Sequence, residues 1–330
     1  PRSSRYGKLR GALNMKGTNM TTTARHSTRL SRRAFLGAMA AGVGLIGLPV
    51  RLRAAPGATG PAIAFDGDAL ILAKDILSRR DGAGGWKELS APAVGSILSL
   101  ATHPGRPGRI AAGLAGGGVA ISEDGGHRWE ARSQGLPYAP VTAVTVAAAE
   151  PDTIYAAIRG DGLWKSEDAG RSWGLAMDRP WLADAERDLT ALASVDLATG
   201  MGGIWIYAGT ETGLTRVPDC FCRWQDVQPG DAMDALVSGK PAPSEAPLPE
   251  GETINALVSA ASQPTRLYAA LPSGIWESQD AGVVWSQRLS TSALAVAVHP
   301  ANADHVVAVT GDGLIESRDG GANWTALARA

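Results

Sequence analysis

The two cysteines are the most reactive side chains of this 330-residue sequence, and Cys220 and Cys222 lie only one residue apart. In an oxidising compartment such a pair forms a tight local disulfide, whereas two thiolates could bind copper or zinc. A complete metal site needs more than two ligands, and no histidine lies between residues 128 and 298. We therefore expect a disulfide or structural pair and predict no cofactor; a metal-handling protein is an alternative.

Three carboxylates stand at turns where an enzyme could use them. Asp161, Glu211 and Asp312 each lie between two expected strands. Carboxylates from different strands can act as general acid, base or nucleophile in glycoside hydrolysis. However, Asp161-Gly162 and Asp312-Gly313 are also typical of ordinary hairpin turns. We expect a protein without catalytic residues, with a carbohydrate-active enzyme as the alternative.

The elements that position these residues follow from a repeated octapeptide, S-x-D-x-G-x-x-W. Its four copies span residues 122–129, 166–173, 278–285 and 317–324, and two incomplete copies run from Asp81 to Trp86 and from Asp219 to Trp224. Repetition at this scale indicates a repeat architecture. The Asp and Trp residues expected to have structural roles are Asp124, Trp129, Asp168, Trp173, Asp280, Trp285, Asp319 and Trp324.

Each octapeptide belongs to a longer unit with four expected strands. In one unit, apolar runs at residues 142–149, 153–158 and 163–165 precede the octapeptide, which leads into a fourth strand. Four short antiparallel strands are typical of a β-propeller blade. We predict an all-β, six-bladed β-propeller of four-stranded blades, with seven blades less favoured. Residues 62–65 and 324–327 supply its first and last strands, so the ring closes without a shared strand.

The residue types of the octapeptide suit folding better than catalysis. Asp and Ser can hydrogen-bond the N–H groups of a turn, Gly permits positive φ, and Trp supplies a large apolar body to pack between blades. These units resemble the Asp-box (BNR) repeats of β-propellers, as in sialidases, sortilin-type receptor domains and photosystem II assembly-factor-like exported proteins. The resemblance covers about residues 62–330 and implies that the octapeptides lie on the blade periphery, away from a catalytic or ligand face. The sequence departs from sialidases because it has no Phe/Tyr-Arg-Ile-Pro stretch.

The N-terminal region resembles a twin-arginine export signal at residues 31–55. Two adjacent arginines precede an uncharged, Gly- and Ala-rich apolar run at residues 34–50. We take residues 1–30 as a non-structural extension and residues 56–330 as the propeller, with an inserted Pro-rich acidic loop at 226–252. We expect a periplasmic or otherwise exported protein, and an uncleaved signal segment would be its only attachment to the membrane.

Charge separates the N-terminal region from the rest of the chain. Residues 1–55 hold eleven of the 31 Lys and Arg residues and no Asp or Glu, so the remainder carries 20 basic and 32 acidic side chains. An acidic folded part argues against nucleic-acid binding and favours a partner with a basic surface. We expect this partner to be another exported protein.

Blade topology places the hairpins between second and third strands, together with the connections between blades, at the end opposite the octapeptides. Two of these connections are long, at residues 177–188 and 226–252, and long loops tend to carry function. A solvated linker is the alternative for the acidic loop. We predict a non-catalytic protein-interaction or assembly module of a periplasmic complex that docks through this face. The candidate docking residues are Asp161, Trp181, Asp184, Glu186, Glu211, Asp231, Asp234 and Asp312.

Overall fold

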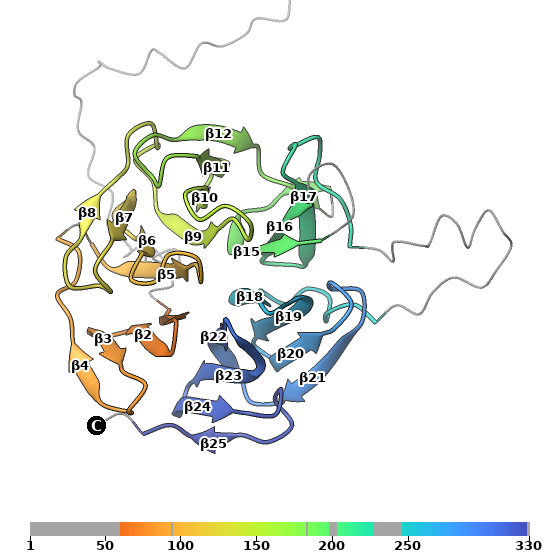
Figure 1. Cartoon of the computed structure of the whole chain (residues 1–330). Coiled ribbons are helices and arrows are strands. Elements are labelled where there is room, and N and C mark those ends of the chain that lie inside the picture. The colour runs from red at the N-terminus through yellow and green to blue at the C-terminus, as the bar shows by residue number, and fades with distance from the viewer. Residues whose placement is uncertain (1–59, 94, 183, 198–202, 228–245, 329–330) are drawn as a thin grey trace, which may run out of the picture. The chain divides into compact units, whose positions relative to one another are not determined.

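The described residues form a β-propeller. The computed structural model describes residues 60–93, 95–182, 184–197, 203–227 and 246–328, all within the compact unit Ala54–Ala330. Six small antiparallel sheets surround a central channel, and the regular elements of the described residues are all strands (Figure 1). The prediction of an all-β, six-bladed propeller is confirmed.

The predicted export signal at residues 31–55 lies outside the described residues. Within the part of the chain that the structure describes, no helix is long and apolar enough to cross a membrane.

The strands of each blade follow one another in sequence, from the channel outward. Blade 1 contains β1 (Ala62–Asp66), β2 (Ala69–Ala73), β3 (Leu77–Arg80) and β4 (Trp86–Glu88). Blade 2 contains β5 (Ile97–Thr102), β6 (Ile110–Leu114), β7 (Val119–Ser122) and β8 (Glu130–Ala131). Blade 3 contains β9 (Val141–Val146), β10 (Ile154–Ile158), β11 (Gly162–Ser166) and β12 (Gly174–Met177).

The second half of the ring begins after a separate hairpin, β13 (Trp181–Leu182) and β14 (Ala185–Glu186). Blade 4 contains β15 (Leu189–Asp196), β16 (Ile204–Thr210) and β17 (Leu214–Pro218). Blade 5 contains β18 (Ala256–Ala260), β19 (Gln263–Leu271), β20 (Gly274–Ser278) and β21 (Trp285–Leu289). Blade 6 contains β22 (Ala293–His299), β23 (Asn302–Thr310), β24 (Gly313–Ser317) and β25 (Thr325–Ala326).

Among the described residues, blade 4 has three strands and not the four expected from its sequence unit. Where the fourth strand is expected, there is one isolated β-bridge. In it, Arg216 and Gln225 exchange backbone hydrogen bonds of 3.0 and 2.8 Å. The incomplete octapeptide of this blade has Val217 where the complete copies have Ser and Phe221 where they have Gly. Without these two residues the turn is built differently, and the chain leaves the sheet after a single bridge.

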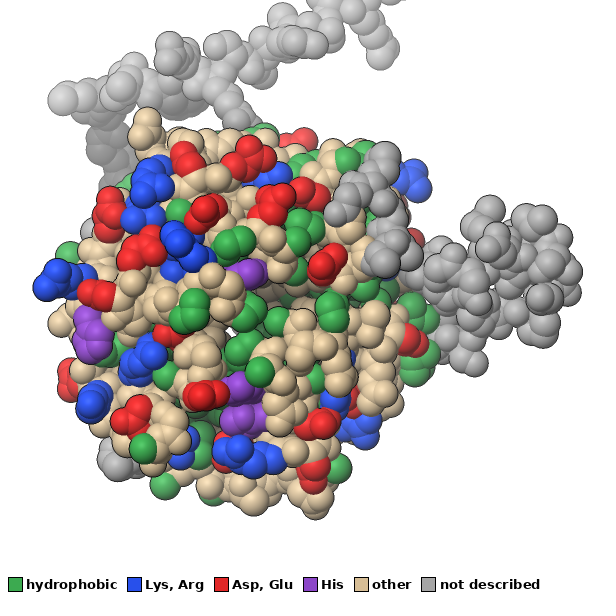
Figure 2. Space-filling view, in the orientation of Figure 1, with side chains coloured by type: hydrophobic (Ala, Val, Ile, Leu, Met, Phe, Trp, Pro, Cys, Tyr) green, Lys and Arg blue, Asp and Glu red, His purple; other side chains and the backbone are tan. Residues whose placement is uncertain are grey.

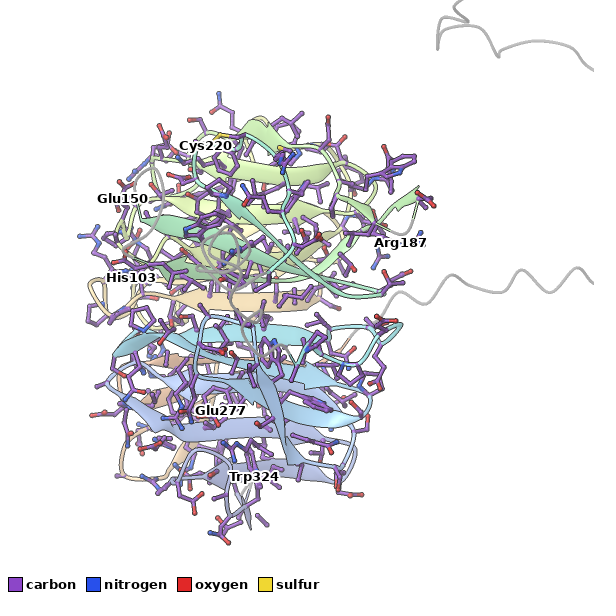
Figure 3. All side chains as sticks on the ribbon, turned by 90° about the vertical axis from the view of Figure 1, so that its right-hand side faces the viewer. His103, Glu150, Arg187, Cys220, Glu277 and Trp324 are labelled. Carbon is purple, nitrogen blue, oxygen red and sulfur yellow. A yellow bond between two sulfur atoms is a disulfide. The ribbon has the colours of Figure 1, made fainter. Side chains whose placement is uncertain are left out.

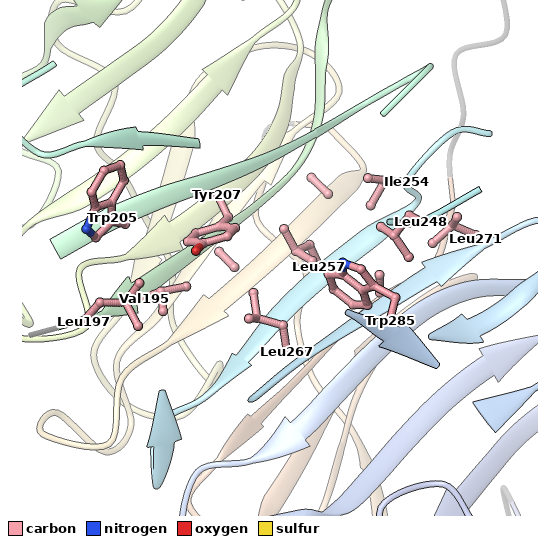
Figure 4. Close-up of a cluster of buried hydrophobic side chains, with 13 residues drawn as sticks. Val195, Leu197, Trp205, Tyr207, Leu248, Ile254, Leu257, Leu267, Leu271 and Trp285 are labelled. Carbon is pink, nitrogen blue, oxygen red and sulfur yellow. The ribbon is translucent and has the colours of Figure 1, made fainter. Parts of the chain in front are cut away.

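The hydrophobic core lies between neighbouring blades. The second strands of blades are buried on both faces, which explains continuous apolar runs such as Ile154–Ile158 in place of alternating polar and apolar residues. Between blades 4 and 5, the rings of Trp205, Tyr207 and Trp285 pack with aliphatic side chains such as Leu257 (Figure 4). Each blade therefore depends on its neighbours to bury its apolar surface.

The four complete octapeptides form turns with a shared hydrogen-bond pattern. Ser166 Oγ accepts the N–H of Gly170 at 2.8 Å, and Asp168 Oδ1 accepts the N–H of Ser172 at 2.9 Å. The equivalent bonds recur in the other three turns. Gly170 has φ 86°, a conformation that side chains other than glycine's disfavour. The Ser and Asp side chains thus satisfy the N–H groups that the tight turn leaves unpaired.

A second set of bonds joins these turns to the preceding blade. The residue before the octapeptide glycine also takes positive φ, 58° in Ala169 and 60° in Ala281, which turns its carbonyl outward from the hairpin. Arg132 Nη1 donates to Ala169 O at 2.9 Å, and the hydroxyl of Tyr207 donates to Ala281 O at 2.8 Å. Trp173 adds a bond from its indole N–H to Arg132 O at 2.9 Å.

Similar joints, made by other donors, connect blades 1 and 2 and blades 3 and 4. Arg79 Nη1 donates to Gly125 O at 3.2 Å. At blade 4, Tyr155 donates its hydroxyl hydrogen to Asp219, and Lys165 Nζ lies 3.2 Å from the same carboxylate. Burial and this hydrogen bond to Asp219 raise the pKa of Tyr155 above its usual range, so the phenol keeps its proton. The end of the blades that carries these turns is called the octapeptide face below, and the other end the loop face.

The ring closes between blades 6 and 1 by side-chain packing. Blade 1 has its own four strands and blade 6 ends with β25, so no strand is shared between them. Phe65 and Leu72 pack with Val307 and Leu314, and Trp86 Nε1 donates to Ala328 O at 3.1 Å.

Removing one hydroxyl should change the titration of a single octapeptide carboxyl. The side-chain hydroxyl and the N–H of Ser172 both stabilise the ionised form and lower the pKa of Asp168 from 3.8 to about 2. In Ser172→Ala we expect this pKa to rise toward 3.8 while that of Asp319, also about 2, stays unchanged. Because the folded-state pKa is lowered, the stabilisation is present above the unfolded-state pKa and is lost as the pH falls toward 2. Carboxyl-carbon NMR titration measures both values, and an Asp168 pKa near 3.8 in the unmodified protein would contradict the turn geometry.

Removing one buried hydroxyl should weaken the joint between blades 4 and 5. Tyr207 is fully buried, and its hydroxyl also accepts a 2.9 Å hydrogen bond from Arg216. We expect Tyr207→Phe to lower the free energy of unfolding by about 1–3 kcal/mol, because it leaves the half-buried Ala281 carbonyl and the half-buried Arg216 guanidinium without this partner. Urea denaturation gives the value. Tyr138→Phe is the matched control, since Tyr138 is 94% exposed, and equal losses in both variants would disprove the role of the joint.

Candidate interaction surface

The described candidate docking residues all lie at the loop face. Asp161, Glu211 and Asp312 stand between the second and third strands of blades 3, 4 and 6, and Trp181, Asp184 and Glu186 belong to the hairpin β13–β14. Figure 3 shows Arg187, next to this hairpin, at one end of the molecule and His103 and Glu150 at the other. Asp231 and Asp234 lie outside the described residues.

The hairpin β13–β14 is a feature that the sequence analysis expected only as a loop. It pairs with neither blade 3 nor blade 4. Arg179 forms ion pairs with Glu186 in the hairpin and, at 3.3 Å, with Asp188 beyond it. Asp188 also accepts the N–H of Gly160 at 2.9 Å, which ties the base of the hairpin to blade 3. The hairpin is therefore fixed in position while its first residue, Trp181, is 65% exposed.

Some of the predicted docking carboxylates are engaged within the protein. Asp161 Oδ2 accepts the indole N–H of Trp164 at 2.9 Å, and Glu186 is paired with Arg179. Their charges are thus less available to a partner than the acidic composition suggests. Asp184 has φ 59° and forms the tip of the hairpin turn, where aspartate tolerates the left-handed conformation.

Exposed large apolar side chains concentrate at the loop face. Five such residues occur among the described residues: Ile76, Tyr138, Leu175, Trp181 and Leu294. Ile76 lies in the β2–β3 hairpin, Tyr138 and Trp181 in connections between blades, and Leu294 at the loop-face end of β22, whereas Leu175 lies on the outer strand β12. Sequence reasoning identified only Trp181; an aromatic residue between two prolines, Pro137 and Pro140, was the available signal for Tyr138.

The loop-face rim of the channel is polar on one side and apolar on the other. The innermost strands of blades 3 and 4 bulge at Thr142 and Thr190, whose hydroxyls donate to Leu189 O at 2.6 Å and Ile254 O at 2.8 Å in the next blade. In blades 2 and 6 the bulged residues are leucines, Leu98 and Leu294. The apolar half of the rim thus lies beside blade 1.

The channel contains two cavities, of about 210 Å³ toward the octapeptide face and about 70 Å³ toward the loop face. Asp161, Glu211 and Asp312 line neither of them, so the structure does not bring these carboxylates together at the channel as the enzymatic alternative requires. Among the described residues lining these two cavities, Asp196 is the one carboxylate.

Histidines gather near the centre of the octapeptide face, as Figure 2 shows in purple. His103 lines the larger cavity, and its Nε2 lies 2.9 Å from Ala148 O of the next blade. The rings of His299 and His305 stack with centroids 5.3 Å apart. Burial lowers the pKa of His305 although its hydrogen bond to Glu316 opposes this shift. No sequence pattern indicates that His299 and His305, six residues apart, stack on each other.

Cys220 and Cys222 are joined by a disulfide with 5.5 Å between their Cα atoms. No cluster of three or more metal-ligating side chains occurs in the part of the chain that the structure describes.

Several solved structures are similar to this chain. A GH74 enzyme from Niastella koreensis has a TM-score of 0.51 at 13% identity, covering 81% of this chain and 46% of that one. YCF48 from Cyanidioschyzon merolae has a TM-score of 0.46 at 13% identity, covering 77% and 78%. The outer coat vertex of COPII on membranes has a TM-score of 0.54 at 8% identity, covering 82% and 70%.

These likenesses concern the fold alone, because similar propellers carry unrelated functions. This chain spans less than half the length of the GH74 enzyme. No protein-family model and no curated protein matches the sequence.

Proposed function

We propose that this protein is an exported, non-catalytic interaction module that docks a partner protein on its loop face. The observation that carries the proposal is the position of the exposed large apolar side chains. Four of the five described ones lie at the loop face, and none lies at the octapeptide face. Exposed apolar residues gathered on one face are typical of interaction sites, whereas scattered ones need no explanation.

Trp181 is the expected centre of this interface. Tryptophan and tyrosine dominate binding energy at protein interfaces because they bury a large area with few rotatable bonds. The ion pairs of Arg179 with Glu186 and Asp188 hold the hairpin before any partner arrives. Little conformational entropy is then lost when the indole ring becomes buried.

Carboxylates around the hairpin suggest the charge of the partner. Asp184 at its tip, with Glu211 and Asp312 in the hairpins of blades 4 and 6, gives the loop face acidic groups beside its apolar residues. Such groups favour approach of a basic surface and increase the association rate more than the final affinity. The partner proposed is therefore an exported protein with an apolar patch bordered by Lys or Arg.

Two observations support export. Residues 31–55 have the order of a twin-arginine signal, and the disulfide between Cys220 and Cys222 fits an oxidising compartment better than the cytosol.

Truncating Trp181 should weaken docking. Cross-linking of the exported protein in periplasmic extract, with mass spectrometry, identifies the partner and the cross-linked face. We expect Trp181→Ala to reduce affinity for that partner by roughly tenfold or more, as loss of a central aromatic residue does. His127→Ala is the matched control, because His127 is an exposed ring in an octapeptide turn.

Two outcomes would contradict this docking face. One is affinity that is unchanged in Trp181→Ala and reduced in His127→Ala; the other is a set of cross-links confined to the octapeptide face.

A further inference from the structure

The incomplete octapeptide turn at residues 217–224 lacks the side-chain hydrogen bonds of the complete turns but has a backbone hydrogen bond from Phe221 N–H to Pro218 O at 2.8 Å. In those turns a Ser Oγ accepts the glycine N–H at 2.8–2.9 Å, but Val217 has no oxygen to offer. The Asp carboxylate normally accepts N–H groups of its own turn, whereas Asp219 faces Tyr155 and Lys165 of blade 3. This turn therefore lacks both side-chain hydrogen-bond acceptors, the Ser hydroxyl and the Asp carboxylate.

A bulky residue also takes the place of the glycine in this turn. Phe221 has φ 49°, in the left-handed region that glycine occupies in the complete turns and that a bulky side chain disfavours. Its ring lies 6.0 Å from that of Tyr155, and Lys165 Nζ lies 5.7 Å from its centroid. Phe221 thus has an unfavourable backbone conformation, and its ring packs against blade 3.

The disulfide flanks this residue on both sides. Cys220 immediately precedes Phe221 and Cys222 immediately follows it, so the S–S bond closes a small ring around the left-handed residue. In this turn the covalent bond takes the place of the Ser and Gly that shape the other turns. Both cysteines are exposed, and Cys220 lies at the molecular surface near the octapeptide face (Figure 3).

We propose that the Cys220–Cys222 disulfide is a thiol–disulfide exchange site, reduced in the folded protein by an external dithiol, and that it controls the order of this turn. One thiolate of the dithiol attacks Sγ of Cys220, the S–S bond breaks, and the electron pair leaves on Sγ of Cys222, which then takes a proton. The second thiolate attacks the dithiol sulfur of the mixed disulfide and releases Cys220. The dithiol loses two electrons and becomes a disulfide, and the two cysteines gain them as thiols.

A neighbouring charge favours this direction of attack. Cys222 is followed by the exposed cation Arg223, and a cation stabilises a leaving thiolate. The mixed disulfide therefore forms at Cys220.

Reduction of the disulfide should weaken the joint between blades 3 and 4. Once the ring is open, Phe221 is free to leave the left-handed conformation. Asp219, two residues before it, carries the bonds to Tyr155 and Lys165. The isolated bridge between Arg216 and Gln225 closes the same segment and has no further strand to support it. Local order at residues 216–225 thus depends on the redox state of the two cysteines.

The first experiment compares reduction of the folded and the urea-unfolded protein by millimolar dithiothreitol, followed by alkylation and mass spectrometry. We expect the two rates to agree within about tenfold, because exposed sulfurs need no unfolding to react. Reduction that is slower in the folded protein by about a hundredfold or more would show that it requires unfolding, and would overturn the exchange site.

The second experiment measures hydrogen exchange in the oxidised and reduced protein. We expect reduction to raise exchange at residues 216–225 about tenfold or more and to leave blade 6 unchanged, as for opening of one local segment. Phe221→Gly is the matched variant. Because glycine adopts positive φ without a covalent constraint, reducing the disulfide of this variant should change hydrogen exchange at residues 216–225 little. Unchanged exchange in the reduced original protein, or equal changes in both proteins, would overturn the coupling. Cys220→Ser with Cys222→Ser should reproduce the reduced state.

Discussion

In the octapeptide turns of blades 2, 3 and 5, the carbonyl of the left-handed residue is the group that joins each blade to the one before it. Two successive residues with positive φ, such as Ala169 and Gly170, close the hairpin and at the same time turn one carbonyl toward the preceding blade. A donor there, such as Arg132 or Tyr207, then links two sheets that share no backbone pairing. A propeller blade buries its faces only against its neighbours, so these joints fix the orientation in which the apolar faces meet.

The two ends of the blades therefore differ in how much their sequence and loop length can vary. The octapeptide face is constrained by its joints, since the complete turns must satisfy their own N–H groups and those of blades 2, 3 and 5 also accept a donor from the preceding blade. At the loop face, bonds between blades such as that from Thr142 to Leu189 O lie at the channel rim, whereas the hairpins and connections farther out can lengthen or gain exposed residues. The hairpin β13–β14 and the exposed Trp181 occur at this less constrained end.

The spacing of the octapeptide tryptophans was enough to predict six blades and the face of each loop, because one residue type at one turn position repeats in every unit. The donors to the neighbouring blade could not be predicted in this way. Arg79 comes from a third strand, Arg132 from the segment after a fourth strand and Tyr207 from a second strand, so they occupy no common place in the repeat. The exposure of Tyr138 and the pairing within β13–β14 depend on three-dimensional packing and not on any local pattern.

The turn of blade 4 shows how the hairpin can form when the octapeptide lacks its Ser and Gly. Loss of the Ser removes a hydrogen-bond acceptor from the turn, and loss of the Gly removes the residue that most readily accepts positive φ. The disulfide supplies the closure by covalent means, and Asp219 is then free to bond with Tyr155 and Lys165. The complete turns contain no cysteine, whereas this one combines the disulfide with a 2.8 Å backbone hydrogen bond from Phe221 N–H to Pro218 O. The proposed redox dependence therefore concerns one joint of the ring, the one between blades 3 and 4. The complete turns do not share that dependence.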